Sequence, residues 1–363
     1  MSRVYKIFFV LFFLFCIFFA AFAKSISESN PEIESVITST YGISSKFAPL
    51  SLFVFADIHG DKKALGRITE FLEKENQYID DSICLGDMVR GSTKSDFSFW
   101  SKTKGAEKIL LTLGNHDTLK TEGLEEYKKE LRDNGTYTSY LIYDYAIDSK
   151  DAYDRYFAPF IKNWNISSEK GKTYYYKDYR NSGIRLVVLR STVRGKELEE
   201  QKEWYKKTLE SAREKNMAIM VASHFTVCRN TENVPCDFSK PNAVFKAPEK
   251  FADFEKITQD FIDKGGEFIC YLSGHHHTDA VLKNKLFPQY EFAVGTASVK
   301  KDKSDNIRST KDKSIDLADI FVADRDAKKM YIIRVGADKT KNNTERKTLV
   351  FDYKNGKVLG PIK

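Results

Sequence analysis

The chain has little that would place it in a membrane or in a disordered class. Beyond residue 23, no apolar run reaches the ~20 residues that a membrane span requires. No internal repeat is present, and 42% hydrophobic with 30% charged residues excludes disordered and collagen-like chains. The 363 residues suffice for one large domain or two small ones, and 13% aromatic residues can build a sizeable core.

Blocks of like charge are also missing. The formal net charge is +7, but lysines and acidic residues are interspersed along the predicted helices. Such a pattern is typical of a solvated surface and is weak evidence for binding to nucleic acid or membranes. We therefore expect no specific nucleic-acid partner, and the sequence indicates no oligomeric state.

Cysteine is scarce, with five residues in the whole chain. Cys84 and Cys270 lie inside apolar runs, where buried thiols are expected. Cys228 and Cys236 flank a short polar loop, and in an exported protein this spacing favours a local disulfide.

The first 23 residues have the pattern of a signal peptide. Arg3 and Lys6 precede an apolar run over residues 7–23, which ends in an A-x-A motif. An uncleaved membrane anchor is the alternative. We therefore expect an exported protein, whether periplasmic, secreted or held at the cell surface.

From residue 50 onward, short apolar runs alternate with amphipathic helical patterns, which predicts an α/β architecture. Residues 24–48 are expected to form a linker or irregular segment before a domain over residues 49–363. From about residue 317 the pattern is mostly β. Strands are predicted at 52–56, 82–85, 109–113, 184–189, 217–222, 268–272, 290–294, 319–323, 329–335 and 348–353, and helices at 62–74, 197–215 and 251–264.

Two segments interrupt this alternation. An insertion rich in tyrosine covers about residues 119–180, and a loop rich in Lys, Asp and Ser is expected over residues 300–316. The tyrosines at 174–176 and 179 could stack on the rings of a polymeric substrate. A strand that packs on the core is the interpretation we prefer.

Histidine is equally scarce, and its placement is informative. The six histidines fall in four places, each directly after a predicted strand: His59, His116, His224 and the run His275-His276-His277. Asp57 and Asp87 also follow predicted strands. Because α/β sheets place their sites at the carboxyl ends of strands, we expect these side chains to converge.

The candidate ligands are carboxylates, imidazoles and an amide, which suit divalent Mn, Fe, Co or Zn. No cysteine lies at any of these strand ends, and a structural zinc site is therefore disfavoured. Seven ligands are too many for one tetrahedral ion, whereas two ions that share a carboxylate would use them well. The predicted set is Asp57, His59, Asp87, Asn115, His224, His275 and His277.

The motifs D-x-H, G-D, G-N-H-D, H and G-H-x-H occur in this order between about Leu50 and Val299. In this the chain resembles the calcineurin-like metallophosphoesterase family. The resemblance implies two packed mixed β-sheets flanked by helices, with the site at the strand ends. It also implies that one metal takes Asp57, His59 and His277, that the other takes Asn115, His224 and His275, and that Asp87 bridges them.

The resemblance further implies that His116 is the proton donor and that Asp117 orients its ring. Arg90 could hold a phosphate bidentately beside Asn115, or it could pair with a nearby acid, and the sequence leaves both open. Two other residues near these motifs are not expected to be ligands. Asp61 is predicted to cap the following helix, and His276 is predicted to point away from the metals.

The motifs of this chain differ from those of two related phosphatase classes, which narrows the predicted class of enzyme. Purple acid phosphatases carry Gly in place of His59 and a Tyr ligand in place of Arg90, so a coloured ferric site is not expected. The segment Gly86–Gly91 lacks one residue of the protein Ser/Thr phosphatase pattern G-D-x-V-D-R-G, and Phe225 stands where that class has Gly after the His. A protein phosphatase is therefore not predicted.

These observations predict an exported dinuclear phosphoesterase that hydrolyses phosphomonoesters or phosphodiesters with a metal-activated water. The alternative is a catalytically silent, metal-stabilised binding module on the same fold. Silent relatives usually lose a ligand or the His of G-N-H-D, and here every such position is filled.

Overall fold

The computed structural model describes residues 35, 36, 39, 46–91, 97–136, 142, 145–229, 231–234, 236, 245, 247–299, 306–309, 315, 317–337, 339–340 and 348–361. The chain divides into two compact units, residues 1–44 and residues 45–363, and the elements named below belong to the second. The predicted signal peptide or anchor over residues 1–23 lies outside the described residues. Among the residues that are described, no helix is both long and apolar enough for a membrane span.

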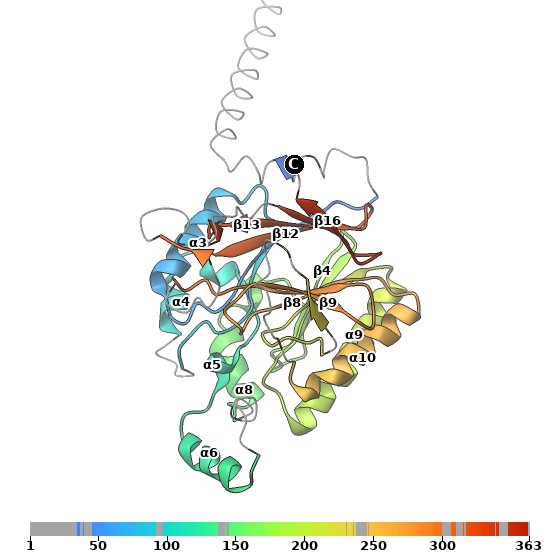
Figure 1. Cartoon of the computed structure of the whole chain (residues 1–363). Helices are drawn as coiled ribbons and strands as arrows, with labels where there is room; N and C mark the ends of the chain where they lie inside the picture. Colours follow the sequence, from blue (N-terminus) through green and yellow to red (C-terminus); the bar gives the residue numbers. More distant parts are fainter. Residues whose placement is uncertain are drawn as a thin grey trace, which may run out of the picture. The chain divides into compact units, whose positions relative to one another are not determined.

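Two seven-stranded mixed sheets build the second unit, and Figure 1 shows them stacked on one another. The first sheet has the order β16-β15-β13-β12-β1-β2-β3. Its strands are β1 (Leu50–Phe55), β2 (Asp81–Cys84), β3 (Leu110–Leu111), β12 (Ala318–Asp324), β13 (Lys329–Val335), β15 (Leu349–Asp352) and β16 (Lys357–Pro361). β1, β2 and β3 are parallel, and the C-terminal strands add to β1 as an antiparallel meander.

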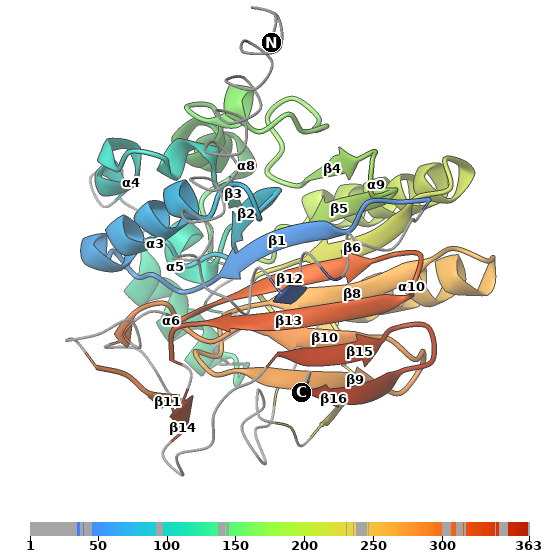
Figure 2. The same ribbon diagram turned by 90° about the horizontal axis from the view of Figure 1, so that it is seen from above.

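The second sheet has the order β4-β5-β6-β8-β10-β9-β7, with β5, β6, β8 and β10 parallel. Its strands are β4 (Tyr175–Tyr179), β5 (Ile184–Val188), β6 (Ala218–Ala222), β7 (Thr231–Asn233), β8 (Phe268–Ser273), β9 (Ala280–Asn284) and β10 (Tyr290–Ala293). Figure 2 shows the strands of the two sheets running in similar directions, as in aligned sheet packing. A separate pair is formed by β11 (Asn306–Ile307) and β14 (Lys339–Thr340).

Helices cover both sheets, which confirms the predicted fold class. α9 (Gly195–Glu214) and α10 (Ala252–Asp263) pack on the second sheet through a core that includes Leu209, Phe254 and Tyr271. α3 (Lys62–Lys74) packs beside β1, and the ring centroids of Phe53 and Phe71 are 5.4 Å apart.

α3 also shows why the local sequence folds as predicted. Leu65 and Ile68 lie on its buried face, and the Asp61 carboxylate accepts hydrogen bonds from the backbone N–H groups of Lys63 and Ala64, both at 3.1 Å. These bonds satisfy donors that the first turn of a helix leaves open. The prediction that Asp61 is an N-cap is confirmed.

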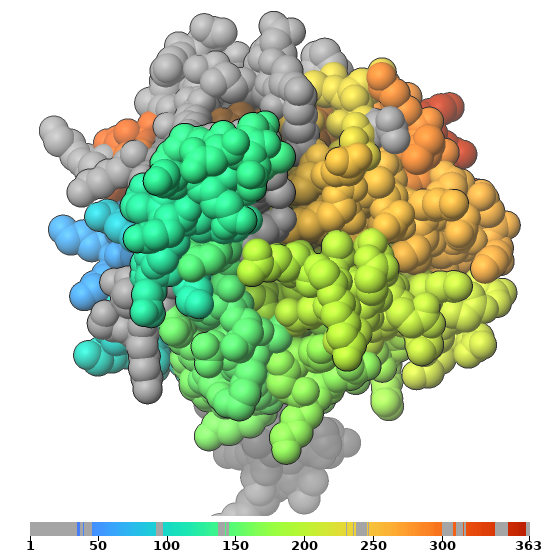
Figure 3. Space-filling model, turned by 90° about the horizontal axis from the view of Figure 1, so that it is seen from below, coloured from blue at the N-terminus to red at the C-terminus, as the bar shows by residue number. Residues whose placement is uncertain are grey.

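The insertion at about residues 119–180 contributes α6 (Leu124–Asp133) and α8 (Ser149–Ala152), and it ends in β4. Figure 3 shows α6 as a teal ridge on the face that also carries α9 and α10. Tyr174 and Tyr175 are fully buried, and the Tyr175 hydroxyl donates to the Leu111 carbonyl at 3.0 Å. Tyr175 is therefore a strand residue packed on the core, as preferred from the sequence, and Tyr174 is buried directly before β4.

The expected disulfide between Cys228 and Cys236 is wrong, since both residues are thiols. Cys228 is fully buried, and its backbone N–H donates to Glu291 Oε2 at 2.8 Å. Burial, followed by the charge of the nearby Glu291 carboxylate, raises the pKa of this thiol well above its usual value. The short spacing of the two cysteines did not reveal this interior contact, in which Glu291 of β10 holds the loop that carries Cys228.

Candidate metal centre

Five parallel strands, drawn from both sheets, end at the same place. Asp57 and His59 follow β1, and Asp87 follows β2. Asn115 opens α5 (Asn115–Thr118), four positions beyond the end of β3. In the second sheet His224 follows β6, and the run His275–His277 follows β8. The parallel strands thus bring the carboxylate, amide and imidazole groups together, although they lie up to 220 positions apart in the chain.

A first group of donors consists of Asp57, His59, Asp87 and His277, whose ligand atoms all lie within 4.8 Å of one another. The Nε2 atoms of His59 and His277 are 3.0 Å apart, and His277 Nε2 lies 3.4 Å from Asp57 Oδ1. This Asp57 oxygen is buried and finds no hydrogen-bond partner among the described residues. Because buried carboxylate oxygens are normally satisfied, the arrangement fits a bound cation.

A second group consists of Asp87, His224 and His275 and shares Asp87 with the first. His224 Nε2 lies 3.4 Å from Asp87 Oδ1 and 3.1 Å from Asn115 Oδ1. All seven predicted ligands therefore surround two neighbouring centres, with Asp87 between them. Carboxylate, imidazole and amide oxygen form a donor set that suits two borderline divalent cations.

The orientation of these ligands is fixed by their other contacts. His224 Nδ1 donates to the Leu85 carbonyl at 2.7 Å, which leaves Nε2 facing the other ligands. The backbone N–H of His224 donates to the Ser191 hydroxyl at 3.1 Å. Asp57 Oδ2 accepts from the backbone N–H of His275 at 3.0 Å, and the Asp57 carbonyl accepts from the Thr296 hydroxyl at 2.7 Å.

Ser191 and Thr296 were not singled out from the sequence. Ser191 lies three residues beyond β5 and Thr296 three residues beyond β10, both in the second sheet. The only available signal was therefore this position, which many serines and threonines share.

The backbone is strained at the ligands. Five of the seven have a left-handed backbone conformation, with φ of +55° at Asp57, +49° at His59, +54° at Asp87, +71° at His275 and +57° at His277. Such a conformation costs a non-glycine residue about 1–3 kcal/mol and occurs most often at functional sites. The concentration of strain at one point is independent support for a functional centre.

In this cluster, burial lowers the pKa of a histidine, whereas nearby carboxylates raise it. Burial dominates at His59 and lowers its pKa to about 4, so the ring is neutral and able to bind a metal. At His224 burial also disfavours the charged form, but Asp87 raises the pKa to about 9. A cation must displace this proton to bind His224, so metal affinity should fall as the pH falls.

Replacing Gly86 with Ala should disrupt the second group. Gly86 has a φ of +92°, and an added Cβ would lie 2.7 Å from both His224 Nδ1 and the Gly114 backbone nitrogen. The strained backbone alone should cost roughly 1–3 kcal/mol, and the clash should displace His224 and lower the bound metal content.

Gly60→Ala is the matched control for this prediction. Its φ of +73° carries similar strain, but the nearest atom to a Cβ there would be Arg90 Cγ, 3.9 Å away. We expect Gly60→Ala to lower the unfolding temperature while leaving the metal content intact. Equal metal loss in the two variants, measured by atomic emission, would contradict the role given to Gly86.

The prediction that Asp117 orients the His116 ring is wrong. His116 Nδ1 donates to the Arg90 carbonyl at 3.0 Å. Asp117 is fully buried and accepts backbone N–H bonds from Asp87 at 2.8 Å, Gly114 at 2.9 Å and Val89 at 3.1 Å. Its carboxylate thus holds the loops that carry Asp87 and Asn115, because its place in the short α5 helix turns it into the protein.

The two remaining candidates lie at the margin of the cluster. Arg90 is exposed, its Nε donates to the His59 carbonyl at 3.0 Å, and none of the described carboxylates forms an ion pair with it. His276 Nε2 lies 3.0 Å from the Thr226 hydroxyl, and the His276 ring contacts Phe245 edge-on with centroids 4.4 Å apart. His276 therefore lies outside both donor groups, as expected.

Comparisons with known proteins agree with this geometry. The structure resembles a dimetal phosphatase from Danio rerio, with a TM-score of 0.50 and 11% identity over 84% of this chain and 99% of that one. It also resembles a purple acid phosphatase from yellow lupin (Lupinus luteus) seeds, with a TM-score of 0.52 and 15% identity over 85% of this chain and 54% of that one. At these identities the likeness shows the fold alone.

No curated protein sequence matches the chain significantly. A family model described as calcineurin-like phosphoesterase matches residues 50–279, which is more than half of the chain and includes all seven candidate ligands. The chain therefore belongs to the calcineurin-like phosphoesterase family and is a metal-dependent hydrolase of phosphoric esters.

Proposed function

We propose that the protein is an exported phosphoesterase that holds two divalent cations and hydrolyses phosphomonoesters or phosphodiesters. The observation that carries this proposal is the pair of donor groups that share Asp87 and include a buried Asp57 oxygen without a hydrogen-bond partner among the described residues. Mn, Fe, Co and Zn all suit this donor set. Export is supported by the basic and apolar pattern of residues 1–23.

The cations supply charge neutralisation for the phosphate and an acidified water as nucleophile. We assign His116 the protonation of the leaving group. Its backbone N–H donates to Asp87 Oδ1 at 2.8 Å, and its ring lies edge-on to His59 with centroids 4.8 Å apart. Because Nδ1 donates to the Arg90 carbonyl, Nε2 is the atom that can pass a proton to the departing oxygen.

Two further side chains can bind the substrate. The Asn115 amide lies beside His224 and presents its NH₂ group as a donor to a phosphate oxygen. Arg90 donates its Nε–H to the His59 carbonyl, and its two terminal nitrogens can donate to a phosphate. The absence of a described acidic partner favours this role over a surface ion pair.

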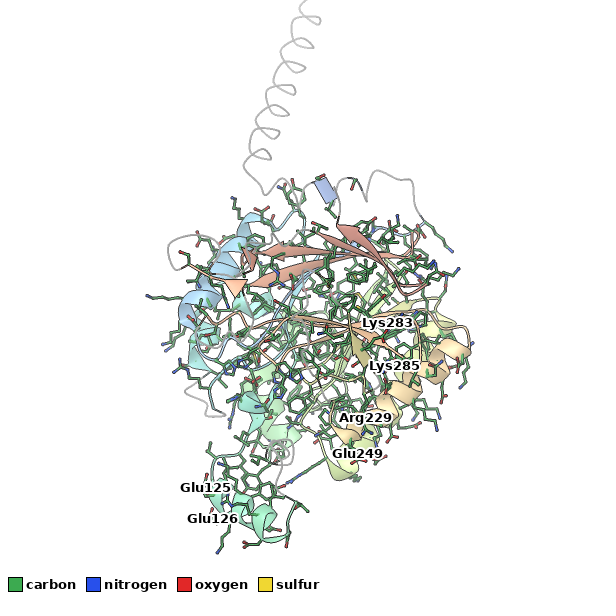
Figure 4. The ribbon with its side chains drawn as sticks, viewed as in Figure 1. Glu125, Glu126, Arg229, Glu249, Lys283 and Lys285 are labelled. Carbon is green, nitrogen blue, oxygen red and sulfur yellow. The ribbon has the colours of Figure 1, made fainter. Side chains whose placement is uncertain are left out.

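Surface charge favours a small phosphate ester over a nucleic acid. Exposed charges of both signs are spread over different elements, and Figure 4 labels six charged residues, of which Glu125 and Glu126 on α6 lie apart from Arg229, Glu249, Lys283 and Lys285. Lys283 Nζ lies 3.9 Å from Glu232 Oε1, so its charge is paired with an acidic residue. A continuous basic surface, which a polyanion would need, is not built by these residues.

Hydrolysis of a panel of phosphomonoesters, phosphodiesters and nucleotides should stop on chelation and return with Mn, Fe(II), Co or Zn. The reason is that bound cations are needed to neutralise the phosphate charge and to activate the attacking water. Release of phosphate or alcohol is measured before chelation, after chelation and after each metal is restored.

The same panel separates the proposal from the silent binding module. A protein that retains two cations but hydrolyses no member of the panel would favour the silent alternative. Activity that persists in a metal-free preparation would contradict the two-cation site itself.

A further inference from the structure

A buried guanidinium joins the C-terminal strands to the metal centre. Arg334 of β13 contacts Asp319 Oδ1 at 2.8 Å and Asp279 Oδ1 at 3.0 Å, and the three side chains are at most 4% exposed. Asp319 is the register neighbour of Arg334 in the first sheet, whereas Asp279 directly precedes β9 of the second sheet. One cationic side chain therefore bridges the two sheets.

The contacts continue from Asp279 to two metal ligands. Asp279 lies two residues after His277, and its Oδ1 also accepts the backbone N–H of Gly295 at 2.8 Å. The next residue, Thr296, donates its hydroxyl to the Asp57 carbonyl at 2.7 Å. Arg334 is thus linked through Asp279 to His277 and Asp57, whose donor atoms are 3.4 Å apart in the first group.

His224 of the second group is held in a different way. His224 is positioned by the Leu85 carbonyl at its ring and by the Ser191 hydroxyl at its backbone. These anchors belong to β2, β5 and their following loops, not to the C-terminal strands. A change at Arg334 should therefore affect the two groups unequally.

A buried ion-pair cluster is weak evidence for stability, because removing charges from water offsets most of their attraction. The cluster lies close to the candidate metal ligands, and side chains that hold such ligands in place govern metal affinity. Positioning of the ligands therefore explains its location better than stability does. We propose that Arg334 is a positioning residue that sets the first cation's ligands through Asp279. This proposal rests on the two-cation site proposed above and gives the C-terminal strands, beyond the matched residues 50–279, a part in that site.

Arg334→Met in the full chain is the direct test. Chelator-treated protein is titrated with Mn²⁺ by calorimetry, and bound metal is counted by atomic emission. We expect the affinity for one of the two ions to fall about 10–100-fold, the range typical of residues that orient metal ligands, while the other ion keeps its wild-type affinity. Asp279→Asn should weaken the same ion.

Arg325→Met is the matched control. Arg325 is also a buried guanidinium, 4% exposed, with Glu267 Oε2 at 3.0 Å and the Asn216 carbonyl at 2.7 Å. These partners lie at the amino ends of β6 and β8, opposite to the metal centre. We expect Arg325→Met to lower the unfolding temperature of the metal-free protein and to leave both Mn²⁺ affinities unchanged.

If Arg334→Met does not fold, Arg334→Lys, which keeps the charge, replaces it. We expect a smaller loss of Mn²⁺ affinity in this variant, again for one ion alone. Equal weakening of both ions, unchanged binding of both, or the same selective loss in Arg325→Met would overturn the role of Arg334. A wild-type protein that does not bind two ions would instead overturn the two-cation site, and this proposal with it. The wild-type titration therefore distinguishes the two failures.

Discussion

Asp87→Asn should lower the rate of hydrolysis more than Asp57→Asn does. Asp87 Oδ1 lies 3.4 Å from His224 Nε2, and its Oδ2 lies 3.9 Å from His59 Nε2, so one carboxylate serves both donor groups. An amide at this position removes the negative charge from between two cations. We expect a rate loss beyond the roughly 10²–10³-fold that follows removal of a single charge-stabilising donor.

Metal content provides the decisive measurement for this prediction. Asp87→Asn should bind one ion or none, whereas Asp57→Asn should keep the ion of the second group because Asp57 belongs to the first group alone. Asp57→Asn is thus the matched control, with the same chemical change at an equally buried position. Two tightly bound ions in Asp87→Asn would show that Asp87 is not the bridge.

His116→Ala should slow the hydrolysis of an alkyl phosphate far more than that of a nitrophenyl phosphate. An alkoxide needs a proton to depart, whereas a nitrophenolate leaves readily without one. General acid catalysis contributes about 10²–10⁴-fold where it is needed, and a loss of this size is expected for the alkyl ester alone. Metal content should be unchanged, because His116 belongs to neither donor group.

Asp117→Asn is the informative companion to His116→Ala. Since the Asp117 carboxylate accepts three backbone N–H bonds and the Arg90 carbonyl holds the His116 ring, this variant should disturb the loops around Asp87. We expect a loss of bound metal and a similar slowing of both esters. Equal slowing of both esters by His116→Ala, or metal loss in that variant, would contradict its role as the proton donor.

The sequence by itself determined the parallel strands and the polar residues that follow them. Alternation of short apolar runs with amphipathic helices is a local property, and helix α3 was found at its observed bounds. β1, β2 and β3 are parallel strands of one sheet and β6 and β8 of the other, so the residues that follow them lie at the carboxyl-end edges of the two sheets, which sheet packing brings together. All seven predicted ligands are therefore found around the two centres that share Asp87.

What the sequence missed depends on contacts between distant segments. The Cys228 backbone N–H donates to Glu291 of β10, and the Asp117 carboxylate accepts from Asp87 and Val89 after β2. Arg334 meets Asp279 across the two sheets, 55 positions away in the chain.

Only the tertiary structure decided these partners. Strand and helix patterns follow from hydrophobic periodicity within a short segment, so they can be read along the chain. The partner of a buried polar group is whichever donor or acceptor the packing brings within hydrogen-bond distance, because leaving such a group unsatisfied in the interior costs free energy. The sequence thus indicated the candidate ligands, whereas sheet packing selected the residues that hold those side chains in place.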